Sequence, residues 1–222
     1  MATIYPALLS LDFLNVQKEL EKIDSLASGY QLDVMDNHFV PNLTYGPDFV
    51  NAVSQFTYKK LWLHLMVDDP NVLLDRFFMQ PESIVSFHIE SNAKISETIK
   101  HIEEKKWFTS IAINPKTPLE EIFPFLPVIH QVLVMSVEPG FAQQDFLPQT
   151  AERIRKLDGF RQSSKLPFRI GVDGGINASN IAQVVTEGAD DIAVASAIFR
   201  AKDPAKAMAE LTDIVHTASR KA

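Results

Sequence analysis

Acidic and imidazole side chains fall at or near the ends of short apolar runs of this sequence: Asp33, His64, His88 and Asp173. A buried carboxylate is costly unless it is paired or bound to a metal. Aspartate and histidine together suit a borderline divalent cation such as zinc, iron or manganese. Any one of these side chains alone is more often a hydrogen-bonded structural residue. Four of them in matching positions favour a site that performs chemistry.

The elements that would position these side chains form a regular series. Segments with helical periodicity, for example 71–79, 95–106 and 177–188, alternate with apolar runs. Such alternation predicts right-handed parallel βαβ units, and eight of them predict an α/β fold, the (β/α)8 TIM barrel, as a single domain over residues 1–222. A doubly wound open sheet is the alternative, although no GxGxxG follows the first run. The predicted strands are Ile4–Leu9, Tyr30–Met35, Leu61–Val67, Ser83–His88, Ser110–Ile113, Gln131–Val137, Arg169–Asp173 and Asp191–Ala195.

Side-chain parity on the second predicted strand separates polar from aliphatic residues. Positions two apart share a face of a strand, so Gln31, Asp33 and Met35 share one face. Leu32 and Val34 share the other and are expected to face the helices. Because barrel enzymes carry their chemistry where strands end and βα loops begin, the polar face is predicted to point into the barrel mouth.

Three methionines are expected beside this polar cluster: Met35, Met66 and Met135. Met66 shares its face with His64, two residues earlier. A methionine inside a barrel commonly fills core space. A polarizable floor beneath a substrate is an equally weighted interpretation of these three residues.

Two loops carry the pattern of a phosphate site. Gly174–Gly175 follows the seventh predicted strand, and residues 177–180 begin a helical segment. Ala195–Ser196 follows the eighth strand, and barrel phosphate sites are typically built from these two loops. A glycine pair is also typical of a plain tight turn. The segment EPGFAQQ after the sixth strand could close over the same region.

Composition restricts the partners and the compartment. The 222-residue chain has a net charge of -7 and no cysteine, which argues against nucleic acid as a partner and against a thiolate metal site. An acidic protein does not attract an anionic substrate as a whole, so any phosphate must be held by local geometry. No signal-peptide pattern and no apolar run of transmembrane length is present. We therefore expect a cytoplasmic protein without a membrane partner.

Several blocks, in order and nearly end to end, resemble the ribulose-phosphate 3-epimerases: LDVMDNHFVPNLTYGPDFV, HLMVDDP, NPKTPLE, VLVMSVEPGF, VDGGIN and SAIFRAKDP. The resemblance implies a TIM barrel of the ribulose-phosphate-binding type. It also implies a cytoplasmic, homo-oligomeric isomerase of the pentose phosphate pathway that takes a small sugar phosphate. The reaction implied is the interconversion of D-ribulose 5-phosphate and D-xylulose 5-phosphate.

The resemblance also implies residue roles. Asp33 and Asp173 match the two aspartates that exchange the C3 proton on opposite faces of the substrate, through a metal-stabilised enediolate. The divalent metal, which could be zinc, iron, manganese or cobalt, would be held by these two aspartates, His64 and Gln31. The residues matched to substrate binding are Met35, Met66, His88 and Met135. Those matched to phosphate binding are Gly140, Ala142, Gln143, Gly174, Gly175, Ala195 and Ser196.

Departures from the family pattern gather at the predicted mouth. Gln31 stands where the family has histidine, and Ala7 where it has a serine that contacts substrate. Ala142 and Gln143 replace glycines, and Ala195 replaces the glycine of a Gly-Ser pair. These changes leave two further functions open: a non-catalytic sugar-phosphate binding protein and a hexulose-phosphate 3-epimerase.

Overall fold

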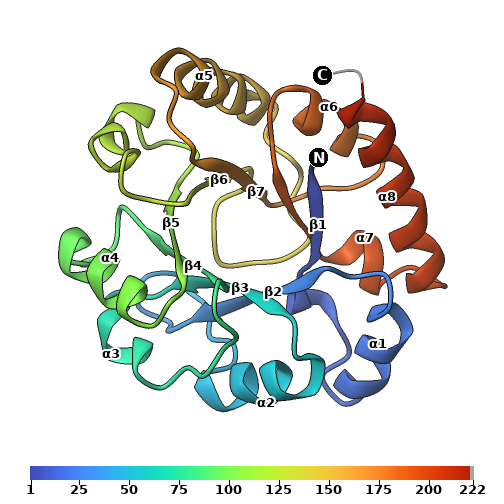
Figure 1. Ribbon diagram of the computed structural model, residues 1–222. Coiled ribbons are helices and arrows are strands. Elements are labelled where there is room, and N and C mark those ends of the chain that lie inside the picture. The colour runs from blue at the N-terminus through green and yellow to red at the C-terminus, as the bar shows by residue number, and fades with distance from the viewer. Residues whose placement is uncertain (221–222) are drawn as a thin grey trace.

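Eight parallel strands curve around a common axis in the computed structural model, which describes residues 1–220 (Figure 1). Each strand pairs in parallel with its neighbours in the order β1-β8-β7-β6-β5-β4-β3-β2. The (β/α)8 barrel prediction is confirmed, and all eight expected strands are present with ends that differ by a few residues. The strands are β1 Thr3–Pro6, β2 Gly29–Met35, β3 Lys60–Met66, β4 Ile84–His88, β5 Phe108–Ile113, β6 Gln131–Met135, β7 Arg169–Asp173 and β8 Asp191–Val194.

Helices form a ring outside the strands (Figure 1). Two of them, α2 and α8, begin with proline, which suits the first turn because its missing N–H would have no helical partner there. Among residues 1–220, no helix has both the length and the apolar character needed to cross a bilayer. The α-helices are α1 Val16–Ile23, α2 Pro47–Thr57, α3 Asn71–Leu74, α4 Ile95–Glu104, α5 Gln149–Ser164, α6 Ile181–Thr186, α7 Ser196–Phe199 and α8 Pro204–Ser219, and the 3-10 helices are η1 Leu8–Ser10, η2 Leu119–Glu121 and η3 Phe123–Phe125.

The alternation predicted for β2 is confirmed. Leu32 and Val34 belong to the core cluster between the strands and the helices. Met35 packs with Met66 and Val40 in a separate cluster. Every residue of β2 is buried, so its polar side chains lie in the interior of the barrel and not on a solvent-exposed face.

The prediction of a helix over residues 71–79 is wrong beyond the first turn, because α3 ends at Leu74. The backbone that follows bonds to a side chain of α2 instead. Asn51 Oδ1 accepts from the Phe78 N–H at 2.8 Å, and Asn51 Nδ2 donates to the Arg76 carbonyl at 3.0 Å. These bonds satisfy groups that a longer helix would have paired within itself.

The barrel closes between β1 and β2 at a single point. A ladder from Thr3 to Pro6 joins β1 to β8, whereas the link to β2 is an isolated parallel bridge between Ala7 and Gln31. Two of the departures named above therefore lie side by side at this seam.

Bulky and charged side chains fill the barrel beneath the mouth. Trp62 is fully buried, and a Cβ added to Gly171 would lie 2.8 Å from its Cη2 atom. Gln131 Nε2 donates to Asp191 at 2.8 Å, and Arg169 binds the same carboxylate through two nitrogens, at 2.7 and 2.6 Å. The interior is a packed core at this level, which leaves the mouth as the place for a ligand.

Gly171→Ala should lower the free energy of unfolding by about 1–3 kcal/mol, because the new methyl group overlaps the Trp62 indole in a closed core. Urea unfolding followed by circular dichroism measures the change. Gly159→Ala in α5 is the matched control, since a Cβ there meets nothing within 4 Å. That variant should be neutral or stabilised by up to about 1 kcal/mol. Equal midpoints for the two variants would contradict the packing described here.

Candidate active site

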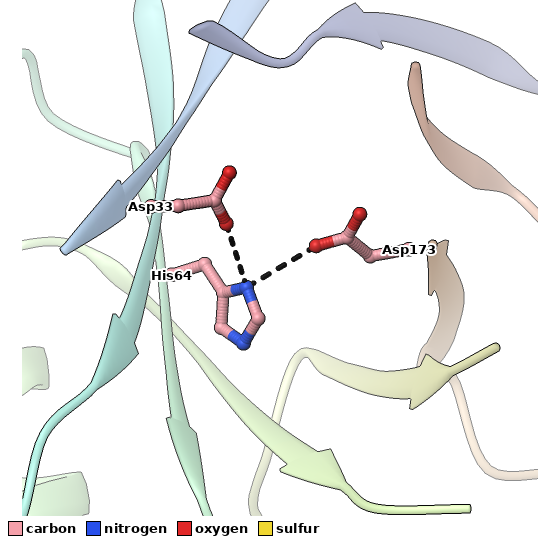
Figure 2. A group of neighbouring side chains, drawn as sticks. All are labelled: Asp33, His64 and Asp173. Carbon is pink, nitrogen blue, oxygen red and sulfur yellow. Dashed lines mark hydrogen bonds and ion pairs between the residues drawn. The ribbon is translucent and has the colours of Figure 1, made fainter. Parts of the chain in front are cut away.

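Asp33, His64 and Asp173 meet at the carboxyl-terminal mouth of the barrel (Figure 2). Asp33 and His64 are register partners on β2 and β3, and Asp173 is the last residue of β7. His64 Nδ1 lies 2.9 Å from Asp33 Oδ1 and 3.2 Å from Asp173 Oδ2. Figure 2 shows the two carboxylates on either side of this one ring nitrogen. The convergence expected from strand ends and parity is therefore present.

The two carboxylates and the imidazole shift one another's protonation. Burial, and then the charge of Asp173, raises the pKa of Asp33 to about 6, although contact with His64 acts in the opposite direction. Burial lowers the pKa of His64, but its hydrogen bonds to Asp173 and Asp33 and their charges outweigh burial and raise it to about 9. A protonated imidazole thus places one positive charge between two acidic groups.

A second histidine fixes the orientation of the first. His64 Nε2 lies 2.9 Å from His88 Nε2, and His88 Nδ1 lies 3.3 Å from Glu90 Oε2. Burial lowers the pKa of His88 to about 4 despite the contact with Glu90. A neutral His88 accepts the His64 Nε2–H and donates its own Nδ1–H to Glu90. This chain of bonds keeps His64 Nδ1 directed at the two aspartates.

His88 was expected among the substrate-binding residues at the mouth. The structure places its ring behind His64, and it does not line the cavity described next. Its fully buried ring also packs against Phe39, with a centroid separation of 4.7 Å. The position supports a positioning role toward His64.

A cavity opens at the barrel mouth beside the aspartates. The structure brings together in its wall most of the side chains predicted for the site. They are Asp33, Met35, Met66, Met135, Gly140, Ala142, Gln143, Asp173, Gly174, Gly175, Ala195 and Ser196, joined by Ala7. Each methionine lines the cavity and is also buried in an apolar cluster. A role in filling the core and a role as a floor beneath a substrate are therefore compatible for these three residues.

The glycine pair after β7 is required by close packing. Gly174 and Gly175 have φ of +117° and +64°, which are conformations that other residues rarely adopt. A Cβ on Gly175 would lie 2.7 Å from the Gln144 carbonyl oxygen and the Phe146 nitrogen. The turn therefore lies directly against the loop that follows β6.

Backbone N–H groups beside the cavity are available as donors for an anion. Within residues 1–220, no Lys or Arg lines the cavity, and the loop hydrogen bonds use none of the N–H groups of Gly174, Gly175, Ala195 and Ser196. The helical start expected at residues 177–180 is instead a turn. There Asn177 N–H and Ser179 N–H donate to Asn side-chain oxygens, and α6 begins at Ile181. The N–H groups of Asn177 and Ser179 are therefore already used within the turn.

The loop after β6 covers the cavity, as expected for the segment EPGFAQQ, and crosses the barrel axis in Figure 1. Gln144 Nε2 fixes the loop by donating to the Glu138 and Phe141 carbonyl groups at 2.6 and 2.9 Å. Gln143 adopts φ of +62°, a left-handed conformation in a residue other than glycine. The residue that replaces a family glycine therefore keeps a glycine-like backbone.

Three residues that hold the backbone of the aspartates were not predicted from the sequence. Thr44 Oγ1 donates to the Asp33 carbonyl at 2.7 Å, and Tyr45 Oη accepts from the Asp33 N–H at 3.0 Å. Ser136 Oγ lies 2.7 Å from the Asp173 carbonyl oxygen. Thr44 and Tyr45 occur inside the quoted block LDVMDNHFVPNLTYGPDFV, but no spacing rule shows that a loop returns to bond its own strand.

Gln31 completes the arrangement. It is fully buried, and its Nε2 donates to Asp173 Oδ2 at 2.8 Å. Its Oε1 is buried and has no hydrogen-bond partner among residues 1–220. One donor atom each from Asp33, His64 and Asp173 lies within 4.8 Å of the others. Two carboxylates and an imidazole form a donor set that fits a divalent cation, and the side-chain amide of Gln31 lies beside it.

The raised pKa of His64 predicts a loss of stability in mild alkali when a chelator is present. An unfolded histidine titrates near pH ~6.5, and His64 does so at about 9. Its contribution is therefore complete below the unfolded value and declines as the pH rises toward the folded one. Urea unfolding between these pH values should show the decline in the wild type and in His216→Gln, a surface control. His64→Gln should lack it, and parallel curves for all three proteins would contradict the ion pair.

Solved structures of low sequence identity share the fold. A 3-hexulose-6-phosphate synthase from Salmonella typhimurium superposes with a TM-score of 0.69 at 17% identity, over 97% of this chain and 99% of that one. An orotidine 5'-phosphate decarboxylase from Pyrococcus horikoshii OT3 gives a TM-score of 0.64 at 17% identity, over 96% and 99% of the two chains.

Sequence comparison is more specific. A ribulose-phosphate 3-epimerase from Synechocystis sp. is 37% identical over 209 residues, covering 93% of this chain and 91% of that protein. The Escherichia coli K12 ribulose-phosphate 3-epimerase is 34% identical over 212 residues, covering 94% and 93%. The sequence model of the ribulose-phosphate 3 epimerase family matches residues 3–199. The chain therefore belongs to the ribulose-phosphate 3 epimerase family.

Proposed function

We propose that this chain, as one barrel domain, interconverts D-ribulose 5-phosphate and D-xylulose 5-phosphate in the pentose phosphate pathway by inverting C3. Its family and its relatives, named for that activity, support the proposal. The observation that carries it is the pair Asp33 and Asp173, which come from separate strands and both line the cavity. The homo-oligomeric state and the cytoplasmic location stay predictions.

Inversion of a carbon next to a ketone requires a proton acceptor on one face and a donor on the other. Asp33 on β2 and Asp173 at the end of β7 supply these two groups. The pKa of Asp33 is raised to about 6, and a pKa closer to neutrality makes a carboxyl group better matched to both accepting and returning a proton. Thr44 and Tyr45 hold the backbone of Asp33, and Ser136 that of Asp173, so each carboxylate keeps its direction.

A divalent cation, which could be zinc, iron, manganese or cobalt, would be held by Asp33, His64 and Asp173. When bound, it would supply positive charge to the oxygens on which an enediolate develops. Two carboxylates in one buried site repel each other and repel an anionic substrate. The protein's own share is to hold His64 through His88 and Glu90, so that Nδ1 faces the aspartates.

The remaining cavity residues are assigned to binding. The N–H groups of Gly174, Gly175, Ala195 and Ser196 are unused donors beside the cavity and would bind the phosphate. Gly140, Ala142 and Gln143 would close the covering loop over it. The methionines Met35, Met66 and Met135 would form the apolar floor beneath the sugar.

Incubation of D-ribulose 5-phosphate with the protein in D₂O should place deuterium at C3, measured by proton NMR. Asp33→Asn and Asp173→Asn should each reduce the formation of D-xylulose 5-phosphate by about 10²–10⁴-fold, since inversion needs both carboxyl groups and an amide cannot carry the proton. Asp48→Asn at the exposed start of α2 is the control and should exchange normally. Saturable binding of the sugar phosphate without exchange, in the presence of added divalent metals, would instead identify a non-catalytic binding protein.

A hexulose 6-phosphate tested in parallel separates the two epimerase functions. We expect kcat/KM to favour the pentulose phosphate, because the covering loop and the Gly174–Gly175 turn are in direct contact and leave the cavity closed on that side. Steady-state rates with both substrates measure this preference. A higher kcat/KM for the hexulose phosphate would assign the protein to the larger substrate.

A further inference from the structure

The side-chain amide of Gln31 has an unsatisfied oxygen next to the aspartates. Nε2 donates to Asp173 Oδ2 at 2.8 Å, whereas Oε1 is buried and has no partner among residues 1–220. An unpaired buried acceptor destabilises the folded protein, because the water that it gave up is not replaced. Rotating the amide by a half-turn would instead place Oε1 against the Asp173 carboxylate. Neither orientation satisfies Gln31 with protein groups alone.

The spacing of the polar atoms shows what would satisfy it. Asp33 Oδ1 and His64 Nδ1 are 2.9 Å apart, His64 Nδ1 and Asp173 Oδ2 are 3.2 Å apart, and Asp173 Oδ2 and the Gln31 amide nitrogen are 2.8 Å apart. Adjacent ligands of an octahedral cation with bonds of about 2.1 Å are about 3.0 Å apart. The Gln31 amide nitrogen, whose place Oε1 takes after the half-turn, therefore lies at the separation expected between neighbouring ligands.

We propose that Gln31 binds the cation through Oε1 as a fourth protein ligand, and that it shifts the site toward harder cations such as Mn²⁺. This inference rests on the proposed metal-assisted epimerase. The ligand set becomes three oxygens, from Asp33, Asp173 and Gln31, and one nitrogen from His64. Carboxylate and carbonyl oxygens suit Mn²⁺, whereas imidazole favours Zn²⁺. The ratio of Zn²⁺ to Mn²⁺ affinity is consequently smaller than for the same site with an imidazole at position 31.

The seam of the barrel makes this role available to a glutamine. Gln31 lies opposite Ala7 in the bridge between β1 and β2, and its side chain is fully buried. It does not line the cavity, so it is not positioned as a substrate contact. Its polar end instead contacts the one carboxylate oxygen, Asp173 Oδ2, that also faces His64.

Metal binding to the chelator-treated protein tests the inference. Zn²⁺ and Mn²⁺ affinities are measured by competition with an indicator dye for the wild type, Gln31→Leu and Gln31→His. Gln31→Leu should weaken Mn²⁺ binding by about tenfold or more, and Gln31→His should raise the Zn²⁺/Mn²⁺ affinity ratio by about tenfold or more. Gln183→His on the exposed face of α6 is the control for an added histidine and should leave the ratio unchanged.

A spectroscopic measurement on the Mn²⁺ complexes keeps the test independent of how well each variant folds or turns over. Electron spin-echo modulation should detect one directly bound imidazole nitrogen in the wild type and two in Gln31→His. An unchanged affinity ratio, one nitrogen in both proteins, full Mn²⁺ affinity in Gln31→Leu, or no cation binding to the wild type would overturn the inference.

The deuterium exchange assay separates this outcome from that of the proposed function. Exchange at C3 that persists in the chelator-treated wild type would refute the role of the cation while leaving the epimerase intact. Mn²⁺ binding with the expected Gln31 dependence but without exchange would support the ligand and refute the activity.

Discussion

Two carboxylates that converge in a buried site cannot both stay charged without a positive group between them, and this constraint organises the mouth of the barrel. His64 Nδ1 fills that place, within 3.2 Å of an oxygen of each aspartate. Its other ring nitrogen is held away from the site by His88, and His88 is in turn held by Glu90. The three strands that carry Asp33, His64 and Asp173 therefore have to be held in fixed register, and the parallel ladders do so. A proton on His64 Nδ1 and a divalent cation bound there would balance the same two carboxylates, so a bound cation would take the place of that proton.

The acidic character of the chain sets a second constraint, on the anion. With a net charge of -7 and no Lys or Arg in the cavity wall among residues 1–220, a phosphate has to be held by oriented neutral donors, chiefly backbone N–H groups. The turn that carries the N–H groups of Gly174 and Gly175 lies directly against the covering loop. Only glycine fits at position 175, because a Cβ there would collide with the backbone at Gln144 and Phe146. The anion site and the loop above it are thus coupled: a side chain at position 175 would displace the loop and the donors together.

Periodicity in the sequence was sufficient to predict the strands and the side chains that they place at the mouth. The eight strands, the inward parity of Gln31, Asp33 and Met35, and the convergence of two aspartates with His64 all follow from alternation and from the common direction of parallel strands.

The features that periodicity could not predict depend on contacts between elements. Helix α3 stops because Asn51 on another helix bonds the chain after it, and the turn at 177–180 uses its own N–H groups through asparagine side chains. His88 ends its strand, as a residue of the site would. Its place behind His64 depends on the orientations of the two rings, which sequence spacing does not encode.

Ala7 and Gln31 are best understood as one change. They are bridge partners at the single point where β1 meets β2, so a substitution at either position alters the same small volume. Ala7 lines the cavity and brings no hydroxyl, whereas Gln31 is withdrawn from the cavity and brings an amide to Asp173. The cavity wall is therefore apolar at the seam, whereas the cluster behind it receives a hydrogen bond from Gln31. If the site had no function, a fully buried Gln31 amide would have no reason to contact Asp173 Oδ2, the same oxygen that faces His64. A shared demand on Asp173 explains both its contact with His64 and its contact with Gln31.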